Sequence, residues 1–280
     1  MTPPTSRRGA VVTGAGRGLG RQLAALLADR GHHVLVTDVD EAAARDAAAE
    51  IGRGATALAL DVRDHAQVER ARDAVLEQTG RLDVWVNNAG VLITGPAWEQ
   101  DEATRRTMLE VNALGTINGT VAAVDAMRGS GGGHVVNVVS LAGLTAVPGE
   151  AVYAASKHAV LGFSLSTMAD LRIAGVRDVT ISCVCPDGMW TPMLHDKLDD
   201  PGAALSFSGR LLQPEEVVEA VRGVLDKPRL VTTVPAGRGL QARFADALPT
   251  LGLRAAPFIA ARGRRTQRKL LAQGGPRPRG

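Results

Sequence analysis

Tyr153 and Lys157 are the residues of this chain whose types and spacing best suit chemistry, and Ser140 lies a short distance before them. In a helix, residues four apart lie on one face, one turn above the other. An ammonium beside a phenol favours phenolate and lowers the tyrosine pKa from its usual value of about 10, which allows proton transfer near neutral pH. Ordinary packing of a helix face produces the same spacing. The surrounding elements therefore have to show whether Tyr153 and Lys157 are a catalytic pair or are merely packed side by side.

A glycine-rich turn near the start of the chain follows an apolar run, residues 10–13, that predicts a buried strand. After the turn, a helical pattern of leucines continues to a stop at Gly31. Glycines let a backbone approach a pyrophosphate, and a helix N-terminus offers free N–H groups and partial positive charge. The turn has the spacing TGxxxGxG and predicts a nucleotide site formed by Gly14, Arg17, Gly18, Leu19 and Gly20.

Asp38 ends the second predicted strand, residues 33–37, and lies 24 positions after Gly14. A carboxylate at this separation can accept hydrogen bonds from the adenosine ribose hydroxyls and would repel a 2′-phosphate, which favours NAD over NADP. Arg17 favours NADP, since it could pair with that phosphate. We give Asp38 more weight, because repulsion close to the ribose is hard to offset. The alternative is an ordinary strand-end carboxylate. Asp40 is expected to cap the helix at 41–51.

Strand and helix patterns alternate along the chain with short links, which predicts parallel βαβ units in a doubly wound sheet. The further strands are expected at residues 55–60, 82–86, 134–139, 179–185 and 230–234. A long helical region at 98–127 contains Asn112, a residue type that often marks a bend or a bound water within a helix. Small polar residues at the strand ends indicate a ligand crevice there.

The charge of the chain is unevenly distributed. The net charge is +3, but residues 261–280 hold seven basic residues and no acid, and without these seven the chain has 25 basic and 29 acidic residues. The main body therefore carries about −4, which argues against nucleic-acid binding.

Cysteine and histidine usage indicates neither a disulfide framework nor a metal site. Cys183 and Cys185 alternate in an apolar run, which is typical of buried strand residues and favours a reducing, cytoplasmic location. The N-terminal residues lack the apolar core of a signal peptide, and no apolar run approaches the ~20 residues that span a bilayer. No ligand spacing connects the histidines, which are His32, His33, His65, His134, His158 and His195.

Six sequence features occur in one order along strands and helices of the predicted kind. They are Thr13-Gly14-xxx-Gly18-x-Gly20, Asn87-Asn88-Ala89-Gly90, Asn112, Ser140, Tyr153-xxx-Lys157 and Pro186…Thr191. In this the chain resembles a classical short-chain dehydrogenase/reductase (SDR) over about residues 7–235. The resemblance implies one Rossmann-type α/β domain with a mostly parallel seven-stranded sheet and helices on both faces.

The resemblance also implies a catalytic set. Tyr153 would be the general acid/base, and Ser140 would hydrogen-bond the same substrate oxygen. Lys157 would lower the Tyr153 pKa and bind the nicotinamide ribose, and Asn112 would hold a water that connects Lys157 to solvent. The hydride would come from the nicotinamide C4 of NAD(H), with NADP as the alternative.

Further cofactor contacts follow from the same resemblance. Asp61 and Val62 resemble the adenine contacts, and Asn88, Ala89 and Gly90 lie beside the glycine loop. The nicotinamide contacts would be Pro186, Gly188, Met189 and Thr191. Asp187 departs from the family pattern, which has Gly at this position. Two interpretations stay open: a left-handed turn conformation that Asp tolerates, or an altered substrate entrance.

Two flanking segments lie outside this resemblance, an N-terminal arm (1–6) and a basic amphipathic extension (236–280). The extension is expected to pack on the domain or on a partner subunit, with a solvated tail; contact with an anionic membrane is the alternative. Pro249 and Pro257 are expected to interrupt any single long helix there. Trp190 and residues 193–198 are expected either to line an apolar pocket or to cover the core.

The leading hypothesis is an oxidoreductase for an apolar secondary alcohol or ketone, acting as a homodimer or homotetramer by analogy with the family. The alternative within enzymes is an NADPH-dependent 3-oxoacyl-thioester or hydroxysteroid reductase. A non-catalytic nucleotide-binding scaffold is the alternative from another class, and the complete set of Asn112, Ser140, Tyr153 and Lys157 argues against it.

Overall fold

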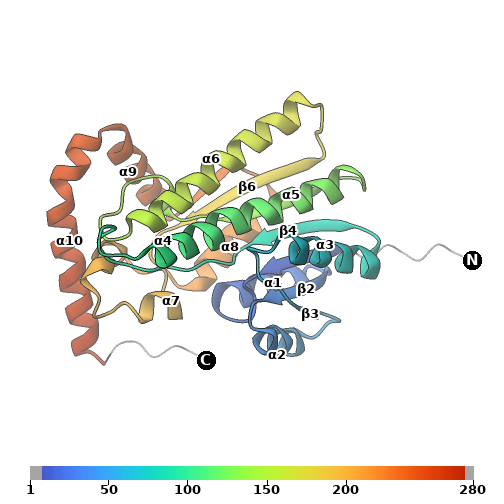
Figure 1. The fold of residues 1–280 in the computed structure, drawn as a ribbon, viewed down its shortest axis with the longest axis horizontal. Coiled ribbons are helices and arrows are strands. Elements are labelled where there is room, and N and C mark those ends of the chain that lie inside the picture. The colour runs from blue at the N-terminus through green and yellow to red at the C-terminus, as the bar shows by residue number, and fades with distance from the viewer. Residues whose placement is uncertain (1–7, 275–280) are drawn as a thin grey trace, which may run out of the picture.

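The computed structural model describes residues 8–274, so the predicted N-terminal arm (1–6) and the last six residues lie outside the described part (Figure 1). Seven parallel strands form one sheet in the order β3-β2-β1-β4-β5-β6-β7. The strands are β1 (Gly9–Thr13), β2 (His33–Asp38), β3 (Thr56–Ala59), β4 (Leu82–Asn87), β5 (Gly133–Val138), β6 (Val179–Pro186) and β7 (Val231–Val234). The predicted doubly wound α/β fold is confirmed, and both cysteines are buried on β6.

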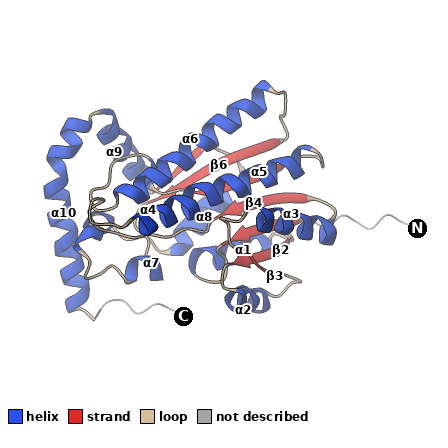
Figure 2. Ribbon diagram, in the orientation of Figure 1, coloured by secondary structure: helices blue, strands red, loops and turns tan. Residues whose placement is uncertain are grey.

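Helices cover both faces of the sheet (Figure 2). The helices of residues 8–274 are α1 (Gly18–Asp29), α2 (Glu41–Ile51), α3 (His65–Thr79), α4 (Glu102–Leu109), α5 (Gly115–Arg128), α6 (Ala151–Ile173), α7 (Pro192–His195), α8 (Pro214–Asp226), α9 (Ala236–Ala247) and α10 (Pro249–Ala272). One apolar core joins α1, α2 and α8 to the sheet, and a second joins α3, α5 and α6 to the opposite face. Because both faces are covered, the central strands β1, β4, β5 and β6 are buried almost continuously rather than at alternate residues.

The long helical region predicted at 98–127 begins later and changes geometry at its middle. Asp101 caps α4, its carboxylate accepting from Thr104 N–H at 2.7 Å. A π-helical turn, η1 (Glu110–Leu114), then separates α4 from α5 and contains Asn112. The expected irregularity at Asn112 is therefore confirmed, and its form is a π-helical insertion, which often occurs at functional sites.

A buried polar chain ties α6 to the sheet. Asn87 on β4 donates to Asn137 Oδ1 on β5 at 2.8 Å, and Asn137 donates to Ser164 Oγ on α6 at 2.8 Å. Trp85 Nε1–H also donates to Asn87 Oδ1 at 2.8 Å. All four residues are buried, so each of these bonds satisfies a group that would be costly to leave unpaired.

The C-terminal part forms two helices, of which α10 packs on a 3₁₀ segment, η3 (Pro201–Phe207). Pro249 begins α10, but the expectation that Pro257 interrupts a helix here is wrong, since α10 continues through it. Pro257 leaves the carbonyl of Leu253 without its helical donor, and because Leu253 is exposed, water can replace that donor. The inner face of α10 supplies the compensating contacts: Gln267 is buried and donates to the carbonyls of Lys197 and Asp200 at 3.0 and 2.7 Å.

Gly263 is predicted to be required for this packing. A Cβ at this position would lie 1.7 Å from the carbonyl oxygen of Ala204 in η3. Gly263→Ala should therefore destabilise the protein by about 1–3 kcal/mol, measured by urea unfolding. Gly223→Ala in α8 is the matched control: no atom lies within 4 Å of its added Cβ, and it should stabilise by about 1 kcal/mol. Equal effects of the two substitutions would contradict the close packing of α10.

Candidate active site

The glycine-rich turn between β1 and α1 leaves its backbone open toward a large cavity. Gly14 and Gly18 have φ angles of +60° and +57°, which side-chain-bearing residues rarely adopt. Gly20 is needed for close packing, since a Cβ there would lie 2.2 Å from the carbonyl oxygen of Gly14. No acidic residue and no side-chain cap occupies the first turn of α1. Its N–H groups therefore suit the phosphates of a nucleotide.

Asn88 and Thr13 hold this turn in place from the neighbouring strand. Asn88 Nδ2 donates to the carbonyls of Thr13 and Gly14 at 3.0 and 2.9 Å. The Thr13 hydroxyl accepts from the N–H groups of Asn88 and Ala89 at 3.0 and 3.1 Å. The predicted position of Asn88 and Ala89 beside the turn is thus what the structure has, and the adjacent Gly90 lines the cavity.

Asp38 lies at the end of β2 with its carboxylate beside the turn. Gly16 N–H donates to Asp38 Oδ2 at 3.0 Å, and Asp40 N–H donates to Oδ1 at 3.1 Å. Asp38 and the exposed Arg17 both line the cavity, so both predicted determinants of cofactor choice lie at the same end of it. Asp40 caps α2 through Ala43 N–H, as expected.

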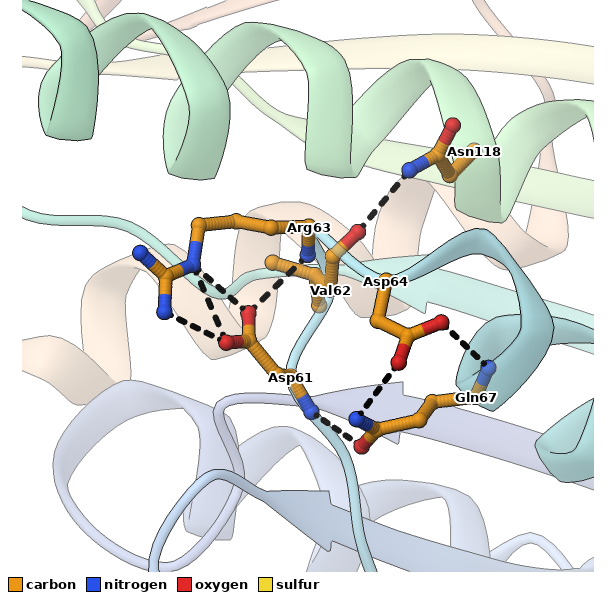
Figure 3. Close-up of polar contacts among 6 residues, drawn as sticks. All are labelled: Asp61, Val62, Arg63, Asp64, Gln67 and Asn118. Carbon is orange, nitrogen blue, oxygen red and sulfur yellow. Dashed lines mark hydrogen bonds and ion pairs between the residues drawn. The ribbon is translucent and has the colours of Figure 1, made fainter.

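Asp61 and Val62 line the cavity after β3, where the adenine contacts are expected. Figure 3 shows the polar contacts of this segment. The Asp61 carboxylate accepts from Arg63 Nη2 at 2.6 Å, and this contact lowers the pKa of Asp61. The Val62 carbonyl accepts from Asn118 Nδ2 on α5 at 3.0 Å. Arg63, which the sequence reasoning missed, also lines the cavity beside Asp61. The sequence feature that could have identified Arg63 is its position two residues after Asp61, an aspartate at a strand end.

Ser140, Tyr153 and Lys157 come together on the cavity wall from the end of β5 and the first turns of α6. Lys157 Nζ lies 5.6 Å from the centre of the Tyr153 ring and donates to the Val138 carbonyl at 3.2 Å. The short helix η2 (Leu141–Gly143) is capped by Ser140 Oγ, which accepts from Ala142 N–H at 3.1 Å. A Cβ on Gly143 would lie 2.8 Å from the Lys157 carbonyl, so η2 and α6 pack closely and bring Ser140 to the pair.

Asn112 is buried beneath this group and does not itself line the cavity. Its side chain accepts from Val91 N–H at 2.8 Å and donates to the Val91 carbonyl at 2.9 Å. It also donates to Ser156 Oγ at 3.1 Å, one residue before Lys157. Asn112 therefore connects η1, the segment after β4, and α6.

The protein environment shifts the pKa values of Tyr153 and Lys157 in opposite directions. Burial raises the pKa of Tyr153 above its usual value, the Glu150 carboxylate raises it further, and the Ser140 side chain lowers it. Burial lowers the pKa of Lys157 to about 8. The expectation that Lys157 lowers the Tyr153 pKa stays a prediction, since burial sets the direction of the Tyr153 shift in the protein alone.

Glu150 is a second buried acid at the site, which the sequence reasoning missed although it lies three residues before Tyr153. Its side chain accepts from Ser206 Oγ at 2.5 Å and lines the cavity. Burial raises the pKa of Glu150 to about 7, and the carboxylates of Asp187 and Asp200 raise it too.

Asp187 adopts neither a left-handed turn nor an unpaired position at the substrate entrance. The only described residue other than glycine with a positive φ is Arg53, so the left-handed interpretation is wrong. Arg238 of α9 donates from Nε to Asp187 Oδ2 at 2.7 Å, and the Asp187 side chain is 9% exposed. A nearly buried ion pair therefore joins the loop after β6 to the C-terminal helices, and both residues line the cavity.

The cavity has a volume of about 1170 Å³ and continues from the glycine turn past Tyr153 to α10. The predicted nicotinamide contacts Pro186, Gly188, Met189 and Thr191 all line it. Of the loop that follows, Met193 lines the cavity, Trp190 packs in a small core with Phe207, and Leu194 does both. Both interpretations of that loop therefore apply.

The fold and this arrangement define a Rossmann-type protein whose cavity begins at a turn suited to a dinucleotide. Residues 8–202 match the family model described as short chain dehydrogenase, and the chain belongs to that family. It is therefore an oxidoreductase acting on CH–OH groups.

Curated relatives include alcohol dehydrogenases. The chain is 40% identical over 202 residues to 1-deoxy-11-beta-hydroxypentalenate dehydrogenase from Streptomyces exfoliatus, covering 70% of this chain and 72% of that protein. It is 36% identical over 219 residues to cyclopentanol dehydrogenase from Comamonas testosteroni, covering 75% and 86%. A short chain dehydrogenase/reductase from Burkholderia phymatum, solved in complex with NAD, matches with a TM-score of 0.77 and 27% identity, covering 90% and 97%.

Glu150 is predicted to make stability depend on pH. Its folded pKa of about 7 lies above the usual 4.5, so the folded state loses stability as pH rises from 4.5 through 7. The free energy of unfolding of Glu150→Gln, measured in urea relative to the wild type, should therefore increase by about 3 kcal/mol between pH 4 and pH 8.

Asp61→Asn is the control of opposite sign. Arg63 lowers the pKa of Asp61, so the wild-type carboxylate adds stability that is lost as pH falls. The free energy of unfolding of the variant, relative to the wild type, should therefore decrease as pH rises. Unfolding free energies of Glu150→Gln that run parallel to the wild type across this range would contradict the burial of Glu150 as an acid.

Proposed function

We propose that the protein transfers a hydride between NAD(H) and an apolar secondary alcohol or ketone, with Tyr153 as general acid/base. The observation that carries the proposal is the meeting of Ser140, Tyr153 and Lys157 on the wall of the cavity that begins at the glycine turn. A substrate oxygen at this position would lie beside the phenol and the Ser140 hydroxyl together. Hydride and proton transfer could then act on one carbonyl group.

In reduction, the Tyr153 hydroxyl donates its proton to the carbonyl oxygen while Ser140 hydrogen-bonds that oxygen. The raised pKa of Tyr153 keeps the phenol protonated before the step. When bound, the nicotinamide supplies or accepts the hydride. Lys157, with a pKa of about 8, can exchange protons near neutral pH and return one to Tyr153. Asn112 hydrogen-bonds the Val91 carbonyl and Ser156 Oγ, and Ser156 directly precedes Lys157. Asn112 thereby positions the lysine.

The cofactor choice follows from the carboxylate at the end of β2. Asp38 Oδ2 already accepts from Gly16 N–H, so the charge is fixed beside the glycine turn and would face the ribose hydroxyls. A 2′-phosphate there would meet a negative charge, which supports NAD over NADP. The NAD found in the Burkholderia phymatum structure supports the same choice. Arg17 keeps NADP as the alternative.

The substrate class is inferred from the cavity wall beyond Tyr153. Leu92, Ala146, Met193, Leu205 and Leu253 contribute apolar side chains there. Two relatives carry names that denote dehydrogenation of cyclic alcohols, cyclopentanol and a hydroxypentalenate. An alicyclic secondary alcohol or the matching ketone is therefore the substrate class that we propose, and a hydroxysteroid is its larger variant. A non-catalytic scaffold would not need a tyrosine paired with a buried lysine on the cavity wall.

The protein is further proposed to act as a homodimer or homotetramer in a reducing, cytoplasmic compartment. The buried free cysteines support the compartment. Exposed apolar side chains on α4 to α6 support self-association, since an assembly would cover them; they are Leu109, Leu114, Val121 and Leu165.

Tyr153→Phe is predicted to lower kcat by about 10²–10⁴-fold, because it removes the proton donor and leaves the ring. NADH binding, measured by fluorescence titration, should stay within about twofold, since the variant keeps the wall of the cavity. His158→Ala, at an exposed position on the same helix, is the matched control and should keep kcat. Retained turnover in Tyr153→Phe would exclude the proposed mechanism.

Asp38→Asn tests the cofactor choice, because it keeps an acceptor for Gly16 N–H and removes the charge. The preference for NADH over NADPH should shrink about tenfold, equivalent to about 1.4 kcal/mol. Dissociation constants of both cofactors for wild type and variant provide the measurement. Tighter wild-type binding of NADPH than of NADH would show that Arg17 outweighs Asp38.

A further inference from the structure

The outward faces of α9 and α10 carry large apolar side chains that no other element within residues 8–274 covers. On α9, Leu240 and Phe244 lie four residues apart and are 73% and 63% exposed. This spacing places them on one face of the helix. Leu248, which separates α9 from α10, is 41% exposed. Buried Gly239 and Ala242 mark the side of α9 that packs on the domain.

α10 continues the pattern with one stripe of mixed character. Successive members lie three or four residues apart and all are exposed; they are Leu251, Arg254, Phe258, Arg262, Arg265 and Lys269. Phe258 is 79% exposed. The buried Gly263 and Gln267 lie on the other side of the helix, against η3. We call the outward stripes of α9 and α10 the C-terminal face.

The charge of this region is strongly one-sided. Between residues 239 and 274, Asp246 is the single acid, and the exposed basic residues are Arg243, Arg254, Arg262, Arg264, Arg265, Arg268 and Lys269. None of these seven forms an ion pair within the described part of the chain. Figure 1 shows α10 at one edge of the molecule, away from the C-terminal end of α6, so the positive charge is concentrated on one side.

We propose that the C-terminal face binds the surface of a membrane that contains anionic lipid. Basic side chains would pair with the headgroups, and the exposed Phe and Leu side chains would enter the boundary of the acyl region. Arginine and lysine suit this position, because their alkyl stems pack along apolar groups while their charges reach the headgroups. No helix within residues 8–274 is long and apolar enough to cross the bilayer, so the protein would lie on it.

Two other occupants fit the face less well. A second copy bound through the same face in a two-fold dimer would bring seven positive charges against seven more, with one acid on each side to offset them. A nucleic acid would satisfy the charges but would hold Leu240, Phe244 and Leu248 against a polar backbone without burying them in an apolar phase.

Docking through the C-terminal face would also affect the active site. Gly252, Ala256 and Ile259 of α10 line the cavity that contains Tyr153. A docked α10 would therefore place one wall of the cavity at the lipid surface, where apolar alcohols and ketones concentrate. This consequence rests on the proposed function, whereas the docking itself is measured without turnover.

The test is co-sedimentation of the full chain with vesicles of phosphatidylcholine alone or with about one third phosphatidylglycerol. Binding is expected to the anionic vesicles and to weaken with salt. Arg262→Gln, Arg265→Gln, Arg268→Gln and Lys269→Gln together should lower the partition coefficient at least a hundredfold, at about fivefold per charge. Phe244→Ser with Phe258→Ser should lower it about tenfold or more, since both side chains would leave the acyl boundary.

Two matched controls should bind as the wild type does. Arg45→Gln, Arg53→Gln, Arg106→Gln and Arg128→Gln remove the same charge from other exposed sites. Ile173→Ser removes an apolar side chain that is 85% exposed at the end of α6. The proposal is overturned if anionic vesicles are not bound, or if the charge control weakens binding as much as the α10 variant does. Binding of duplex DNA in place of vesicles, or a dimer that the Phe→Ser variants dissociate, would assign the face to those partners.

Discussion

The buried chain of hydrogen bonds from Asn87 through Asn137 to Ser164 is the constraint on which the geometry of the site depends. It fixes α6 against β4 and β5 with amide groups that have no access to water, so any shift of the helix would leave one of them unpaired. Ser164 lies two turns beyond Lys157 on the same helix. The position of the Tyr153–Lys157 pair relative to the strand ends is therefore set by a contact made well away from the cavity.

The nucleotide turn is held by the same means on the other side of β4. Asn88 is adjacent to Asn87, and its side chain binds the carbonyls of Thr13 and Gly14. The last residue of β4 thus anchors α6, and the residue after it anchors the glycine turn. Because the two anchors are consecutive, a change in the register of β4 would displace the expected cofactor site and the candidate catalytic residues together.

The sequence predicted the parts of the fold and site that depend on local patterns. Strand–helix alternation, the glycine spacing and the YxxxK pair are each contained in a few consecutive residues, and the structure has all of them at the predicted positions. It could not reveal partners that meet only after folding. Ser206 is 56 residues from Glu150 and Arg238 is 51 from Asp187, and neither side chain forms part of a pattern. The path of α10 through Pro257 was mispredicted because it depends on packing against η3 rather than on local propensity.

These long-range contacts change how Asp187 is understood. As a lone substitution for glycine it suggested a local change in the loop after β6, but its carboxylate is 9% exposed and would be costly to leave without Arg238. The pair makes α9 part of the wall beside the predicted nicotinamide contacts and so makes the C-terminal helices part of the site. Helices α9 and α10 line the cavity on their inner side and carry exposed basic side chains on their outer side. Whatever binds the outer side therefore lies close to the path of the substrate into the cavity. The substrate range of this protein would then be determined by α9 and α10 as much as by the residues around Tyr153.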